Sequence, residues 1–185
     1  MPTEKCMFSF GNSSVLTPWE QYKGGGYFVN IFTQGDSHFL GNINNGEIEL
    51  SELGKHLDAT LRGLHERYPF AQIPVFVIMP DHVNLILIIQ HDEKQPSKCP
   101  DSETAEIIPK DPQNLSIHEL ASRCVLLSTA VNGIKASVRQ HANKQGIAFE
   151  WQAGYHNRLI HDADEFFRVA VFMENHPGKM KKESL

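Results

Sequence analysis

Apolar and polar positions alternate along the chain in a pattern that predicts a β-sheet interleaved with helices. Runs rich in β-branched and aromatic residues indicate strands at 27–33, 73–79 and 82–90. Shorter strands are predicted at 47–50 and near 154–160. The two strands in the middle of the chain are separated only by a Pro-Asp turn, which predicts an antiparallel hairpin.

Three helices are predicted from apolar spacing and from capping residues. The first covers about residues 52–66, with leucines three or four positions apart. Capping-box patterns open the second helix, at about 116–142, and the third, which begins near Asp162. We expect the third helix to end at His176, because Pro177 follows it.

This order of elements predicts an α+β fold, a ferredoxin-like sandwich with an antiparallel sheet and helices packed on one face. The stretch between the strand at 82–90 and the second helix contains four prolines and many charges, so it is expected to be a loop or insertion. The predicted organisation is an irregular arm at 1–25, one domain at 26–178 with an insertion at 91–114, and a basic tail at 179–185.

Charge and cysteine content narrow the functional class. The formal net charge of -5 does not by itself favour a nucleic-acid binder. Residues 115–185 carry 9 bases and 7 acids, however, so an anionic partner should meet this part of the chain. The three cysteines fit neither a disulfide framework nor a zinc motif. Neither a signal peptide nor a membrane span is indicated, and a cytoplasmic location is expected.

Two pairs of side chains are candidates for chemistry. His82 and Asn84 are two residues apart on a strand and should project from the same face. Phe172 and His176 are four residues apart on the last helix and should share its face. A third feature is a set of basic residues in the C-terminal part of the chain: Lys135, Arg139, Lys144, Arg158, Lys179, Lys181 and Lys182.

Each feature also has a structural interpretation. A lone histidine on a strand is more often hydrogen-bonded structure than a ligand. His-x-Asn is not a metal signature, since a carboxamide oxygen is a weak ligand that suits hard cations. Phe172 has the character of a packing residue, and a lysine-rich terminus is usually a solvated tail. The residues alone therefore support only an α+β domain with a candidate polar site at His82.

Several segments together resemble a known family. They are GGYFVNIFTQ, VFVIMPDHVNLILII and FEWQAGYHNRLIHDADEFFRVAVFMENHP, in this order. The chain from about residue 24 to 178, without 91–114, resembles the REP-associated tyrosine transposases, which are single-tyrosine HUH transposases. The resemblance implies an enzyme that cleaves single-stranded DNA beside a hairpin through a covalent phosphotyrosine. It also implies a divalent metal, Mg²⁺ or Mn²⁺, that polarises the scissile phosphate.

The resemblance places the first metal-binding histidine at His82 and the second at Asn84. The tyrosine position falls on Phe172, and the third ligand on His176. Phenylalanine has no oxygen to attack phosphorus, so phosphotyrosine chemistry is not expected. Asp81 should face the opposite side of the strand from His82, so no carboxylate is expected beside the imidazole.

Three functions remain open from the sequence. The first is a catalytically degenerate, transposase-like protein that binds single-stranded or hairpin DNA as a homodimer, with the basic residues named above as its DNA-binding residues. The second is a metal-dependent endonuclease with a remodelled site, and the third is a scaffold for protein contacts. Tyr155 is a weak candidate for a substitute nucleophile, since its geometry must first allow attack.

Overall fold

The computed structural model describes residues 25–35, 37–44, 47–90 and 117–179, without the side chains of residues 47, 117–120 and 176–179. The insertion predicted at 91–114 lies outside these ranges, as do the predicted arm and tail except for residues 25 and 179. The strands are β1 (Gly25–Phe32), β2 (Gly41–Asn44), β3 (Glu47–Leu50), β4 (Ala71–Ile78), β5 (His82–Ile89) and β6 (His156–Ile160). The helices are α1 (Glu52–Arg62), α2 (Leu64–Arg67), α3 (Ile117–Lys144) and α4 (Ala163–Lys179). Within the described ranges, no helix is long and apolar enough to cross a membrane.

The main sheet contains β4, β5, β1 and β6 in that order, and every neighbouring pair is antiparallel. β2 and β3 form a separate hairpin. Apart from this hairpin, β1, α1, β4, β5, α3 and β6 follow one another as βαββαβ, with the last strand beside the first. This is the arrangement of a ferredoxin-like sandwich. The predicted α+β fold, an antiparallel sheet with helices packed on it, is confirmed.

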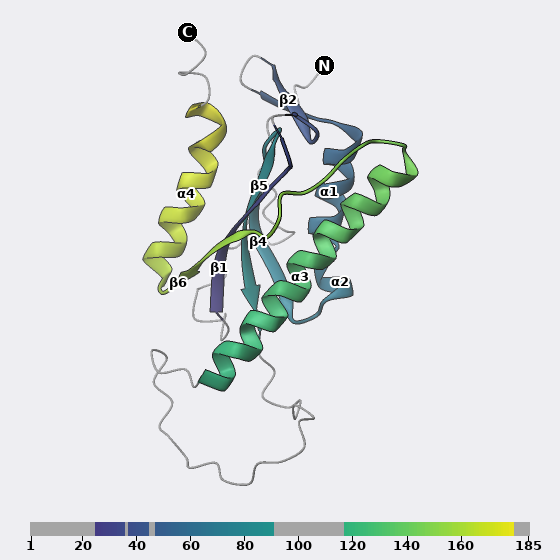
Figure 1. The fold of residues 1–185 in the computed structure, drawn as a ribbon. Helices are drawn as coiled ribbons and strands as arrows, with labels where there is room; N and C mark the ends of the chain where they lie inside the picture. Colours follow the sequence, from purple (N-terminus) through teal and green to yellow (C-terminus); the bar gives the residue numbers. More distant parts are fainter. Residues whose placement is uncertain (1–24, 36, 45–46, 91–116, 180–185) are drawn as a thin grey trace, which may run out of the picture.

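Helices cover both faces of this sheet (Figure 1), so the prediction that they pack on one face only is wrong. α1 and α3 share one face, where Leu85 and Leu87 of β5 join their core. α4 packs on the other face, against Ile86 and Ile88. All eight residues of β5 are buried. A strand that is apolar on both sides needs cover on both sides, which explains why α4 lies opposite the pair of helices on the first face.

Two helix boundaries differ from the sequence prediction. Gly63 divides the predicted 52–66 helix into α1 and α2. The predicted end of the last helix at His176 is wrong, because α4 continues to Lys179. Pro177 lies near the end of the helix, where it removes one backbone N–H donor. The few residues that follow it can still be helical.

A histidine pair lies where α1 meets α3. The rings of His56 and His141 are stacked, with centroids 4.0 Å apart and planes 7° apart. His56 Nε2 lies 3.1 Å from Ser137 Oγ, and that hydroxyl lies 3.2 Å from Thr60 Oγ1. Burial lowers the pKa of His56, and the nearby His141 and Lys144 lower it further, while the Ser137 contact opposes them.

The lowered pKa of His56 predicts that the free energy of unfolding decreases at acidic pH. The pKa of His56 is lower in the folded chain than its ordinary value of about 6.5, so the unfolded chain binds more protons as the pH falls. The stability is therefore fully present above about pH 6.5 and is lost as the pH falls through the lowered pKa. Urea midpoints measured across this range should fall with pH. His56→Gln should flatten the dependence, and an unchanged slope would remove His56 as its source.

Candidate functional site

One end of the α4-covered face of the sheet is polar. His82 and Asn84 are buried, with 7% and 2% of their surfaces exposed. Ile86 and Ile88, at the next alternate positions of β5, pack in the α4 core. Because side chains alternate along a strand, His82 and Asn84 face the same side. Their shared face agrees with the prediction from their spacing.

The strand register brings three further side chains to this place. Asn84 is paired with Asn30 of β1, and Asn30 is paired in turn with His156 of β6. His82 is paired with Phe32. The Phe32 ring stacks on His82 at 5.1 Å and 28° and meets His156 edge to face at 5.9 Å and 80°. We call these five residues the polar end of the sheet.

Asp81 contacts His82 directly. Its Oδ1 atom lies 2.7 Å from His82 Nδ1. The expectation that Asp81 faces away from His82 is wrong, because Asp81 precedes β5 and is not subject to strand alternation. In this turn Met79 N donates to His82 O at 2.8 Å, and the carbonyl of Asp81 accepts from Thr33. A carboxylate at Nδ1 orients the imidazole and favours a lone pair on Nε2.

Asn30 was not singled out by the sequence analysis. Its Oδ1 atom is buried and accepts no hydrogen bond in the structure as described. An unpaired buried carbonyl oxygen costs free energy, and at a functional site such an atom is suited to a water or a cation. The only signal for Asn30 in the sequence is that it is the polar residue in the otherwise apolar stretch VNIF. Its pairing with Asn84 depends on tertiary structure.

α4 places Phe172 beside this face. Phe172 is 45% exposed, and its ring meets Phe28 of β1 edge to face at 6.5 Å and 89°. Phe28 lies two positions before Asn30, on the same face of β1. His176 is in the last turn of α4, but its side chain lies outside the described residues. The assignment of His176 as the third metal ligand, together with His82, therefore stays a prediction.

Tyr155 lies on the opposite face of the sheet. Its hydroxyl is 3.0 Å from Ser128 Oγ on α3, and its ring packs against the core shared by α1 and α3. The sheet thus separates it from Phe172. This position does not suit Tyr155 as a substitute nucleophile at the polar end.

The donor set at the polar end fits a hard cation better than zinc. Among the described side chains, no three His, Cys, Asp or Glu residues are grouped as metal ligands. The donors present are the imidazoles of His82 and His156 and the amide oxygens of Asn84 and Asn30. Amide oxygens suit Mg²⁺ and Mn²⁺. His82, Asn84 and Asn30 would hold such an ion, which would polarise a phosphate oxygen when bound.

The predicted DNA-binding residues Lys135 and Arg139 are already engaged. Lys135 Nζ donates to the backbone carbonyls of Gln152 and Gly154, at 2.9 and 2.8 Å, and burial lowers its pKa. Arg139 Nη2 lies 2.7 Å from Glu150 Oε1. Lys135 therefore holds the 152–154 segment against α3, and an anion at Arg139 must compete with a carboxylate.

The structure describes the side chains of only two of the other predicted basic residues, Arg158 and Lys144. Arg158 lies on β6, where its Nη1 is 2.9 Å from Glu165 Oε1 of α4. Lys144 is exposed at the end of α3. Lys179 ends α4, with its side chain outside the described residues. Lys181 and Lys182 also lie outside those residues.

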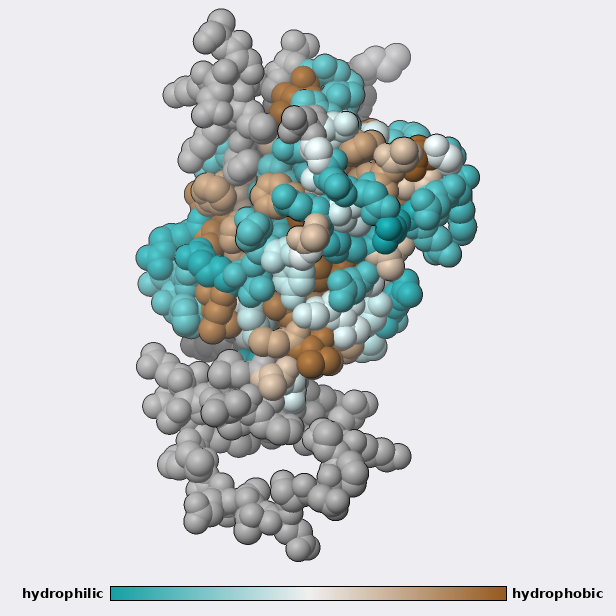
Figure 2. Space-filling view, viewed as in Figure 1, coloured by the Kyte–Doolittle hydropathy of each residue, from teal (hydrophilic) through white to brown (hydrophobic). Residues whose placement is uncertain are grey.

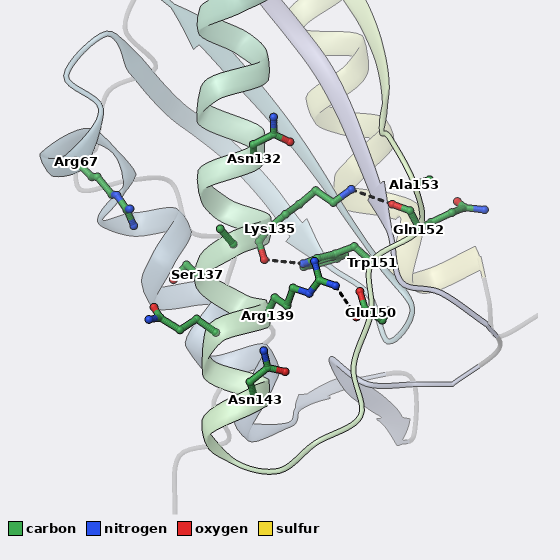
Figure 3. A pocket seen from close by; sticks show the side chains of 12 residues that line it. Arg67, Asn132, Lys135, Ser137, Arg139, Asn143, Glu150, Trp151, Gln152 and Ala153 are labelled. Carbon is green, nitrogen blue, oxygen red and sulfur yellow. Dashed lines mark hydrogen bonds and ion pairs between the residues drawn. The ribbon is translucent and has the colours of Figure 1, made fainter.

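A pocket of about 650 Å³ lies over α3 and the 150–153 segment (Figure 3). Lys135, Arg139 and Glu150 line it, together with Arg67 from α2. Arg67 was not identified from the sequence, because nothing local connects it to residues so far along the chain. Figure 2 shows mainly hydrophilic side chains over the C-terminal half of α3.

Comparison with known proteins supports the fold but not a family assignment. No family model matches the chain. A protein of Haemophilus influenzae strain Rd, described only as uncharacterized, is 25% identical over 162 residues, which are 87% of this chain and 84% of that protein. The structure of the REP-associated tyrosine transposase bound to a REP hairpin matches with a TM-score of 0.51 and 14% identity, over 85% of this chain and 68% of that chain. The fold is therefore transposase-like.

Proposed function

We propose that this protein is a transposase-like DNA-binding protein whose ligand is single-stranded or hairpin DNA. The observation that carries the proposal is the common placement of His82 and Phe172. The resemblance assigns these positions to a metal ligand and to the nucleophile, and both lie on the α4-covered face of a transposase-like sheet. The hairpin bound by the similar transposase supports DNA as the ligand.

In this proposal the chain binds DNA without phosphotyrosine cleavage. The ring of Phe172 carries no nucleophilic oxygen, and the hydroxyl of Tyr155 lies across the sheet beside Ser128. The polar end would then hold DNA or a metal ion without forming a covalent intermediate. In this proposal the protein keeps a transposase-like fold without the tyrosine nucleophile.

Fluorescence anisotropy tests the proposal. A labelled DNA hairpin from the flanks of the protein's own gene should bind with a submicromolar dissociation constant. The binding should weaken steeply with salt, because phosphate contacts release counterions. A denaturing gel of the same mixture should show no protein–DNA adduct. Absence of binding at low salt would overturn DNA binding and turn attention to the scaffold function.

The contact between Asp81 and His82 favours a second candidate function, a metal-dependent endonuclease. A carboxylate that orients an imidazole is a common partner of a metal-binding histidine. A bound Mg²⁺ or Mn²⁺ would activate water in place of the missing tyrosine. In this case the hairpin should be cleaved only with metal, and His82→Ala should abolish cleavage while His65→Ala, an exposed histidine of α2, leaves it unchanged.

The expected homodimer is also part of the proposal. Light scattering should give twice the 20.9 kDa mass of one chain. A measured mass equal to that of one chain would contradict the proposed homodimer without affecting the DNA-binding proposal.

A further inference from the structure

The segment that forms most of α3 lacks acidic residues to an unusual degree for this chain. The whole protein has 22 Asp and Glu residues, but residues 120–149 contain none. The same stretch carries Arg123, Lys135, Arg139 and Lys144. Such a segment has a positive potential although the net charge of the chain is -5. The first acid after it is Glu150.

The exposed side of α3 carries a polar stripe. Asn132, Arg139 and Asn143 are exposed and line the pocket, and their spacing of seven and four residues places them on one side of the helix. Gln140 also lines the pocket. Amide and guanidinium groups are the donors that commonly contact phosphate oxygens of nucleic acid. The stripe therefore has the chemistry of a phosphate-backbone surface.

Arg67 is held at the edge of this surface by packing. Its guanidinium lies 5.6 Å from the centre of the Tyr68 ring. Tyr68 in turn packs so closely on α3 that a Cβ at Gly133 would lie 2.3 Å from its hydroxyl oxygen. A cation held over an aromatic ring in this way loses less freedom when it binds an anion.

Glu150 is the one acid among the residues that line the pocket. It pairs with Arg139 at 2.7 Å, and the two side chains are 52% and 56% exposed. An exposed ion pair contributes little to stability. An arginine also binds phosphate with the same fork geometry that it uses for a carboxylate. A phosphate group can therefore replace Glu150 at Arg139 without loss of the fold.

The arrangement of the two arginines indicates the kind of anion. Figure 3 shows Arg67 on one side of α3 and Arg139 on the other. One phosphate ion at either arginine would leave the other without a ligand. A chain of phosphates that crosses α3 would contact both, as well as the amides between them.

We propose that the outer surface of α3, from Arg67 to Arg139, binds the phosphodiester backbone of DNA, and that Glu150 is an intramolecular competitor for Arg139. This inference rests on the proposed function, because it takes DNA as the ligand. It adds a binding surface on the sheet face opposite the polar end. It also identifies Glu150 as a residue that limits affinity.

Glu150→Gln tests the competitor directly. The variant should bind the labelled hairpin, and an unrelated duplex of equal length, about fivefold more tightly at low salt. Glu52→Gln is the matched control, since it removes the same charge from another exposed ion pair, with Lys55 on α1. The control should leave the affinity unchanged. Equal tightening by both variants would show a net-charge effect and overturn the assignment.

Arg67→Ala tests the other end of the surface. The variant should reduce the slope of log affinity against log salt by about one, as expected for one lost phosphate contact. Hairpin binding by the wild type with no effect of Glu150→Gln or Arg67→Ala would overturn the surface and leave the proposed function standing. No binding by the wild type or by Glu150→Gln would overturn both. Binding gained only in Glu150→Gln would support the competitor and contradict DNA binding by the natural chain.

Discussion

Gly54→Ala should destabilise the protein by about 3 kcal/mol or more, although alanine is the better helix former. A Cβ at this position would lie 2.0 Å from the carbonyl oxygen of Leu40 and 3.0 Å from its carbonyl carbon. This neighbour is backbone, and the amide of Leu40 is itself bonded to Pro80 O at 3.0 Å. The clash therefore cannot be relieved by turning a side chain. Urea unfolding followed by circular dichroism would measure the loss.

Gly63→Ala is the control for this substitution. Gly63 lies between α1 and α2 with φ -86°, which any residue adopts. A Cβ there would lie 3.3 Å from Ala59 O, a distance that small shifts accommodate. We expect its effect to stay below about 1 kcal/mol. A similar loss of stability in the two variants would show that lack of space for a Cβ is not the reason for glycine at position 54.

Trp151→Ala should cost about 3–5 kcal/mol, in the range of large aromatic deletions from a core. Trp151 is 7% exposed, and its ring meets Phe149 edge to face at 5.0 Å. Its Nε1 donates to Lys135 O at 3.1 Å, and its backbone forms a β-bridge with Thr33. The substitution would therefore separate α3 from the end of β1. The same urea titration would measure it.

Trp151→Phe separates packing from hydrogen bonding. It keeps a smaller aromatic ring against Phe149 and removes the indole N–H together with part of the ring, for a cost of about 1 kcal/mol from the hydrogen bond and a further loss from packing that is smaller than in the Ala variant. The Ala variant would also loosen the 152–154 segment, whose carbonyls at Gln152 and Gly154 accept from Lys135. It should therefore weaken DNA binding more than the Phe variant does. An Ala variant as stable as the Phe variant would contradict the packing argument.

The strands and most helix positions follow from local patterns in the sequence. β1, β4 and β5 match runs rich in β-branched and aromatic residues. Ser51 caps α1 by accepting from Gly54 N at 3.0 Å, as serine commonly does at a helix start. The cover on the second face could also have been predicted, because the run from Leu85 to Ile89 is apolar without alternation. The prediction nevertheless placed the helices on one face only, and no local pattern shows that α4 provides the cover of the other face.

The candidate site was predicted only where spacing within one element determines it. His82 and Asn84 share a face because they are two residues apart on a strand. Asn30 joins them through the register of β1 with β5, which no local pattern reports. Asp81 was misplaced because strand alternation was extended one residue beyond the strand. Arg67 and Glu150 meet the basic residues of α3 only through tertiary packing.

The cover of the sheet by different helices on its two faces has a consequence for evolution. Substitutions at well-separated sites without shared partners act almost independently on stability. Side chains around Phe172 and around Arg139 lie on opposite sides of the sheet and share none of the contacts described for either. Selection can therefore relax on one side while it preserves the other. A lineage that changes the side chains of α4 need not change those that α3 displays, and the two surfaces can record separate histories in one chain.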